Sequence, residues 1–174
     1  QIANKPDTSR IEYFEVIGKK TAELFGASGQ SGVIIANGTI KQQKAAYDYG
    51  FNLGLAFQII DDIMDYLAET NIMGKNIGDD FKLGKTTLPI ILAWENSDAR
   101  EKEFWIRTLQ KLEQKELDFE NALNIIKKYN IIEQCKNIAE TFIDTSICAL
   151  EFFPETKFKK PLLDLANQSL NRKK

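Results

Sequence analysis

The residues best suited to chemistry are three aspartates within the apolar segment "FQIIDDIMDYL". Asp61 and Asp62 are adjacent and Asp65 follows, so that with Gln58 they occupy positions i, i+3, i+4 and i+7. In an α-helix of about 3.6 residues per turn, these positions form one polar stripe. An ordinary exposed acidic face would carry lysine or arginine at i+4 spacing, and none occurs over residues 50–74. The crowding therefore favours a bound cation, and carboxylate oxygens suit Mg²⁺.

Basic residues that could bind phosphate lie in two further segments. Lys75 and Lys85 flank the glycine-containing stretch "KNIGDDFKLGK" directly after the acidic segment, and Lys20 precedes Thr21 in "GKKTA". Glycines let the backbone approach a bound group, and lysines supply point charges for phosphate. Either segment alone would be typical of a solvated loop or helix face. Together with the aspartates, they predict a site for Mg²⁺ and a diphosphate.

Helices must position these residues, because apolar side chains recur at helical spacing and no alternating strand pattern occurs. Ser9 and Glu12 form a capping-box pattern ahead of the first helix, and the small residues of 26–38 indicate a closely packed or broken helix. A long helix is expected from Thr39 to about residue 68, followed by a loop over 70–85. Further helices are expected near residues 86–96, from Ser97, from Asp118, over about 131–151, and after Pro154. The class is all-α, a helical bundle.

Composition excludes several kinds of chemistry. The 174 residues carry a formal net charge of −2, which argues against general nucleic-acid binding. Histidine is absent, so serine–histidine and cysteine–histidine catalysis and histidine metal sites are excluded. Cys135 and Cys148 are predicted to be buried thiols in a reducing compartment, although a disulfide stays open. No apolar run approaches the length of a membrane span.

The combined pattern resembles the trans-type polyprenyl (isoprenyl) diphosphate synthase family, and the long-chain bacterial members most closely. The resemblance includes the aspartate-rich motif DDxxD, the preceding "GLAFQI", the following "GKNIGDDFKLGKTTLPIILA", and the upstream "YFEVIGKKTAELF". It implies the isoprenoid-synthase fold, with residues 1–174 as a C-terminal portion of a polyprenyl synthetase domain.

The resemblance also implies an activity and its residues. Such an enzyme is a prenyltransferase that lengthens a Mg²⁺-bound allylic diphosphate with isopentenyl diphosphate, giving polyprenyl diphosphates for isoprenoid or quinone side-chain biosynthesis. Asp61, Asp62 and Asp65 would bind the metal as catalytic residues, and Asp80 would orient lysines or metal-bound waters. Lys20 would be a fourth catalytic residue. The residues expected to contact the allylic diphosphate are Lys20, Thr21, Gln58, Lys75 and Lys85.

The family carries two aspartate-rich motifs, and only the second has a counterpart in this sequence. We therefore expect residues 1–174 to be the C-terminal half of such an enzyme, inactive in elongation alone, cytoplasmic, and homodimeric when full length. A different class stays open: a non-catalytic subunit or remnant that supports a heteromeric prenyl synthase. A terpene cyclase, whose acids also bind Mg²⁺-diphosphate, is less favoured because the lysine-containing loop is typical of chain-elongating enzymes.

Overall fold

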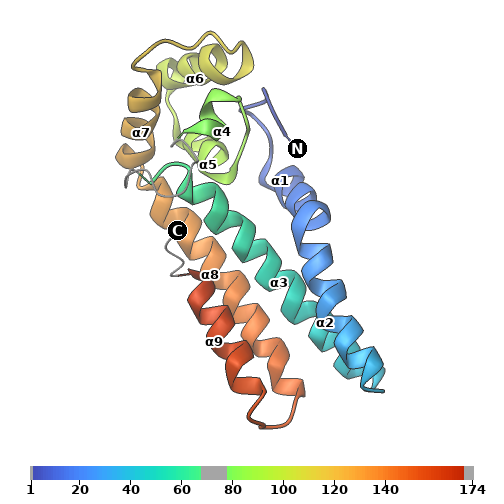
Figure 1. Cartoon of the computed structure of the whole chain (residues 1–174). Coiled ribbons are helices and arrows are strands. Elements are labelled where there is room, and N and C mark those ends of the chain that lie inside the picture. The colour runs from blue at the N-terminus through green and yellow to red at the C-terminus, as the bar shows by residue number, and fades with distance from the viewer. Residues whose placement is uncertain (1, 68–77, 171–174) are drawn as a thin grey trace. The chain divides into compact units, whose positions relative to one another are not determined.

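The computed structural model describes residues 2–67 and 78–170, and these residues form helices joined by short connections (Figure 1). Within these ranges the β-structure is a single isolated antiparallel bridge between Ala3 and Lys85. The α-helices are α1 (Arg10–Ile17), α2 (Glu23–Ile35), α3 (Ile40–Met64), α4 (Asp79–Lys82), α5 (Leu88–Asn96), α6 (Ala99–Trp105), α7 (Asp118–Lys128), α8 (Ile131–Ala149) and α9 (Lys159–Leu170). Two π-helical segments, η1 (Gly18–Ala22) and η2 (Ile106–Gln110), and the 3₁₀-helix η3 (Leu150–Phe152) complete the described elements. The all-α prediction is confirmed for the described chain.

The chain divides into two compact units. The first comprises Gln1–Val16, Asp61–Cys135 and Lys174, and the second comprises Ile17–Ile60 and Lys136–Lys173. Helix α3 therefore contributes its last turn to the first unit and its preceding turns to the second. The acidic motif belongs to the first unit, whereas Lys20, Thr21 and Gln58 belong to the second.

Several helix starts follow from local sequence, as expected. The backbone amide of Ser9 donates to the Glu12 carboxylate at 3.0 Å, and the amide of Glu12 donates to the Ser9 hydroxyl at 3.2 Å. This reciprocal capping satisfies two amides that the first helical turn leaves without backbone partners. Thr87 is the N-cap of α5, with Pro89 in the first turn, where its missing amide hydrogen costs nothing.

The predicted start of a helix at Ser97 was wrong by one residue. Ser97 ends α5, and Asp98 is the N-cap of α6. The side chain of Asp98 accepts from the Glu101 amide at 2.9 Å, and the Glu101 carboxylate accepts from the Asp98 amide at 3.1 Å. Two amides are satisfied at once by this pair, which a serine cap without the facing glutamate would not achieve. The Ser97 hydroxyl instead accepts from the indole of Trp105 inside the first unit.

In the second unit, α2 and α3 approach closely through glycines. A Cβ on Gly50 would lie 2.3 Å from the carbonyl oxygen of Phe25 on α2, and one on Gly54 would lie 2.7 Å from the Cα of Ala22, the last residue of η1. From the other helix, a Cβ on Gly29 would lie 2.5 Å from the carbonyl oxygen of Ala46. The small residues of 26–38 therefore permit close packing, and α2 continues unbroken through residue 35.

Helices α8 and α9 lie alongside α3 in the second unit (Figure 1). Tyr49 on α3 joins all three helices, because its carbonyl accepts from Ser146 at 2.9 Å and its hydroxyl donates to the Leu162 carbonyl at 2.9 Å. Along α8 the buried side chains recur at helical spacing: Ile131, Cys135, Ala139, Ile143 and Ser146. Cys148 lies off this stripe and is exposed, so the prediction that it is buried was wrong. Both cysteines are free thiols.

The first unit is built around α5. Its residues Leu88 to Ala93 are all buried, which is the pattern of a helix surrounded by other elements. Arg107 and Asp118 close the loop before α7 through two hydrogen bonds of 2.8 Å between guanidinium and carboxylate. Among the described residues, no helix is both long and apolar enough to cross a membrane.

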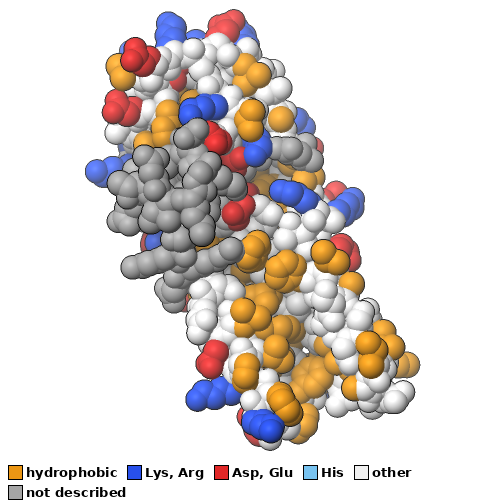
Figure 2. Space-filling view, viewed as in Figure 1, with side chains coloured by type: hydrophobic (Ala, Val, Ile, Leu, Met, Phe, Trp, Pro, Cys, Tyr) orange, Lys and Arg blue, Asp and Glu red, His pale blue; other side chains and the backbone are white. Residues whose placement is uncertain are grey.

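Large apolar side chains are also exposed in the second unit. Figure 2 shows hydrophobic side chains gathered at the surface over its elements. The exposed ones include Leu24, Ile35, Ile40, Phe158 and Leu165. Leu24 on α2 is 71% exposed, whereas Ile17 at the end of α1 is buried. Exposed apolar surface of this kind is typical of faces that another chain segment or partner covers.

Candidate functional site

The acidic motif lies at the C-terminal end of α3. Asp61 and Asp62 occupy its last turn, whereas Asp65 lies in the turn that follows. The predicted helix to about residue 68 was therefore too long. The amide of Tyr66 bonds to the Ile63 carbonyl at 3.0 Å, a tightened i to i−3 contact, and the Asp65 carbonyl accepts from the amide of Gly78 at 3.1 Å. These bonds end the α-helical pattern one residue before the third aspartate.

Asp62 lies inside the first unit. Only 6% of its surface is exposed, and its Oδ2 accepts a hydrogen bond of 2.7 Å from the hydroxyl of Tyr13 on α1. Burial and the neighbouring Asp62 carboxylate raise the pKa of Tyr13 well above its usual value, so the phenol stays protonated as a donor. Burial of the nearby Cys135 thiol, together with the charge of Asp62, raises the pKa of that thiol to about 12.

Asp65 meets the start of α4. The backbone amide of Asp80 donates to the Asp65 carboxylate at 3.0 Å, and the Asp80 carboxylate forms an ion pair with Lys85. Burial, with the neighbouring charge of Asp80, raises the pKa of Asp65. The hydrogen bond to Asp80 raises the pKa of Lys85 and keeps its ammonium charged. Asp80 is thus paired with Lys85, and its role in orienting lysines or metal-bound waters stays a prediction.

In the first unit, Asp65 after the end of α3 therefore lies beside Asp80 and its partner Lys85. The one-turn α4 falls within the stretch predicted as loop, and it was missed because four residues give no periodic pattern. Lys75 lies outside the described residues, so its expected contact with diphosphate stays a prediction.

The donor chemistry of the acidic motif fits a magnesium ion. Among the described residues, no group of three carboxylate, cysteine or histidine side chains is arranged to hold a metal. Mg²⁺ needs only one or two carboxylates, since it retains several waters and takes substrate phosphate oxygens. Asp61 and Asp65, one turn apart, supply that number. Asp62 is engaged by Tyr13 and is better suited to support them.

The second unit holds the other predicted residues. The Thr21 hydroxyl donates to the amide oxygen of Gln58 at 2.8 Å, which joins η1 to α3. Lys20 is exposed. Both Lys20 and Thr21 lie in the π-helical turn η1, where the amide of Glu23 bonds to the carbonyl of Gly18, five residues earlier. Single π-helical turns within helices occur frequently at functional sites, and no sequence pattern indicated this one.

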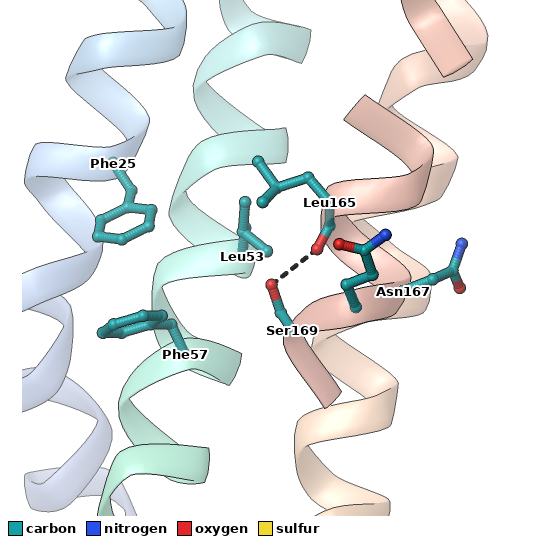
Figure 3. A pocket seen from close by; sticks show the side chains of 7 residues that line it. Phe25, Leu53, Phe57, Leu165, Asn167 and Ser169 are labelled. Atoms are coloured by element: carbon teal, nitrogen blue, oxygen red, sulfur yellow. Dashed lines mark hydrogen bonds between the residues drawn. The ribbon is translucent and has the colours of Figure 1, made fainter. Parts of the chain in front are cut away.

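An apolar pocket lies in the same unit (Figure 3). It has a volume of about 630 Å³, and Phe25 and Phe57 stand on one side with their ring centroids 5.5 Å apart. Leu53 of α3 and Leu165 of α9 face it from other directions. Phe57 therefore borders a cavity as well as packing against Phe25.

Sequence reasoning missed Tyr13 altogether. A tyrosine within a helix carries no signal of its own, and its partner Asp62 lies 49 residues away. Only the packing of α1 against the end of α3 in the first unit reveals the pair.

The helical fold and the acid-rich end of α3 define an all-α protein of the isoprenoid-synthase type. The polyprenyl synthetase family model matches residues 1–126, so the chain belongs to the polyprenyl synthetase family. It is 37% identical to octaprenyl diphosphate synthase of Haemophilus influenzae over 169 residues, covering 97% of this chain and 51% of that protein. The corresponding Escherichia coli enzyme is 35% identical, with coverage of 97% and 52%.

Solved structures agree with this assignment. A decaprenyl diphosphate synthase from Rhodobacter capsulatus superposes with a TM-score of 0.91 at 37% identity, covering 97% of this chain and 52% of that one. A polyprenyl synthase from Caulobacter crescentus, complexed with calcium and isoprenyl diphosphate, superposes with a TM-score of 0.92 at 39% identity. The match covers 98% of this chain and 52% of that one. The chain thus spans about half the length of the relatives it matches.

Proposed function

We propose that this chain forms the diphosphate-binding part of a prenyltransferase that elongates an allylic diphosphate with isopentenyl diphosphate. The observation that carries the proposal is the arrangement in the first unit. Asp61 and Asp65 lie about one helical turn apart, and the Asp80–Lys85 ion pair is held directly against Asp65. Carboxylates beside an oriented lysine suit a divalent cation that carries a diphosphate, rather than either ion alone.

In this proposal Asp61 and Asp65 hold Mg²⁺, with Asp62 supporting them. When bound, the metal supplies Lewis-acid stabilisation of the negative charge that develops on the departing diphosphate. Lys85, held in place by Asp80, adds a fixed positive charge toward the same leaving group. Lys20 and Lys75 would contribute further charge to the diphosphate.

Thr21 and Gln58 have a positioning role in the proposal. Their hydrogen bond fixes the amide of Gln58 on α3, three residues before Asp61. A fixed amide can donate to a diphosphate oxygen without first losing rotational freedom. The apolar pocket beside Phe57 would exclude water from the hydrocarbon portion of a substrate, which protects an allylic cation from hydrolysis.

The family membership and the named relatives support this reaction class. The Caulobacter crescentus protein binds calcium and isoprenyl diphosphate, which is the ligand chemistry proposed here. A non-catalytic subunit is the second candidate, because the chain covers about half of its relatives. The paired aspartates and the Asp80–Lys85 contact favour the catalytic reading, since a scaffold would not need them together.

An elongation assay separates these candidates. We expect the chain alone, incubated with Mg²⁺, farnesyl diphosphate and labelled isopentenyl diphosphate, to give no product. Co-expressed with the part of the Haemophilus influenzae enzyme that it does not match, it should give linear labelled polyprenyl diphosphates. Cyclic hydrocarbon from farnesyl diphosphate would indicate a cyclase instead. Full activity of the chain alone would contradict the view that both aspartate-rich motifs are required.

A further inference from the structure

Tyr13 hydrogen-bonds directly to the acidic motif, although no sequence pattern indicated it. It is 2% exposed, and its hydroxyl donates to Asp62 Oδ2 at 2.7 Å. Asp62 is itself only 6% exposed. A buried carboxylate requires hydrogen-bond donors to replace water, and losing one is costly. Tyr13 is therefore one of the groups that keep Asp62 in place.

The position of Tyr13 is fixed by its surroundings in the first unit. Its ring packs edge-on against Phe14, with centroids 5.4 Å apart. Helix α1 is attached to α5 by the ion pair between Arg10 and Glu95. Cys135 is fully buried near the same carboxylate. Helix α1 is thus fixed in place, and the hydroxyl of Tyr13 points toward Asp62.

We propose that Tyr13 is a positioning residue for the acidic motif, whose hydroxyl fixes Asp62 and thereby orients Asp61 and Asp65 toward a divalent cation. The inference rests on the proposed function, in which these aspartates hold the cation. Groups that hydrogen-bond to metal-binding side chains orient them, and their removal typically lowers metal affinity about 10–100-fold. Tyr13 acts through Asp62 and need not touch the cation or the diphosphate.

Direct metal binding tests this role without relying on activity. Mn²⁺, as a paramagnetic probe for Mg²⁺, is titrated into the chain and free Mn²⁺ is followed by electron paramagnetic resonance. The variants are Tyr13→Phe, Asp62→Asn and the double variant. Tyr49→Phe is the matched control, because it also deletes a buried tyrosine hydroxyl, one that donates to the Leu162 carbonyl in the second unit.

We expect Tyr13→Phe to raise the dissociation constant for Mn²⁺ about 10–100-fold. Tyr49→Phe should lower the urea midpoint to a similar degree and leave Mn²⁺ affinity unchanged. Because Tyr13 acts through Asp62, the double variant should bind no more weakly than Asp62→Asn alone. Circular dichroism confirms that each variant is folded at the titration temperature.

Three results would overturn the inference. The first is a Tyr13→Phe variant whose dissociation constant for Mn²⁺ lies within twofold of that of the parent chain. The second is a Tyr49→Phe variant that loses as much Mn²⁺ affinity as Tyr13→Phe. The third is a Tyr13→Phe loss that adds in full to that of Asp62→Asn. A parent chain that binds no Mn²⁺ would contradict the proposed function itself, and the inference with it.

Discussion

Replacing Gly50 with alanine should destabilise the second unit, although alanine is the better helix former. A Cβ at this position would lie 2.3 Å from the carbonyl oxygen and 2.7 Å from the carbonyl carbon of Phe25, and 3.0 Å from the Cα of Gly26. All three atoms belong to the backbone of α2, so no side-chain rotation relieves the clash. The helices must separate, which also strains the contact between Thr21 and Gln58.

The magnitude follows from two opposing effects. Overpacking a close contact costs about 1–3 kcal/mol, and replacing glycine by alanine within a helix returns about 0.5–1 kcal/mol. The difference between these effects spans roughly 0–2.5 kcal/mol, and the free energy of unfolding should fall toward the upper end of that range because the contacts are with backbone. For a chain of this size, the melting temperature should fall about 2–4 °C for each kcal/mol.

Gly32→Ala is the matched control. Gly32 lies on α2, and a Cβ there would meet no atom within 4 Å. The free energy of unfolding of this variant should rise by about 0.5–1 kcal/mol from helix propensity alone. Urea unfolding followed by circular dichroism measures both. A Gly50→Ala variant as stable as the parent, or a Gly32→Ala variant equally destabilised, would refute the close packing of α2 and α3.

Two further predictions concern ionisable groups. The hydrogen bonds from Arg107 lower the pKa of Asp118, so its folded-state pKa lies below its unfolded value. The pair therefore stabilises the fold above about pH 4, and this contribution is lost as the pH falls through the lowered pKa. Asp118→Asn should lower the urea midpoint at pH 7 and flatten its decline below pH 4; an unchanged decline would contradict this. Cys148 should react with Ellman's reagent at pH 8, whereas Cys135, with its pKa raised to about 12 by burial, should react only in denaturant. Equal reaction rates in the native chain would count against the burial of Cys135.

Local sequence predicted the features whose partners lie within four residues. The Ser9–Glu12 capping box, the position of Pro89 and the start of α7 at Asp118 are confirmed. Each depends on backbone amides and carbonyls of one helical turn, so the neighbouring side chains suffice to specify it. The DDxxD motif, together with the flanking "GLAFQI" and "GKNIGDDFKLGKTTLPIILA", indicated the family, and the family model confirms it.

Tertiary contacts set the features that sequence could not predict. The end of α3 before Asp65 depends on an amide contributed by Gly78, and the orientation of Asp62 depends on Tyr13. The exposure of Cys148 depends on which face of α8 packs inward. In each case the contacting residues lie outside the local segment, so the pattern of that segment could not predict them. The metal-binding and substrate-binding roles of the predicted site residues stay predictions.

The most direct measurement compares two aspartates of α3 in the co-expressed enzyme. Asp61 lies in the acidic motif, whereas Asp48 is paired with Lys44 on the same helix, about three and a half turns earlier in the chain. We predict that Asp61→Ala lowers kcat for incorporation of labelled isopentenyl diphosphate by about 10²–10³-fold or more, and that Asp48→Ala changes it less than twofold. A near-normal rate for Asp61→Ala would contradict the claim that this end of α3 holds the metal and diphosphate.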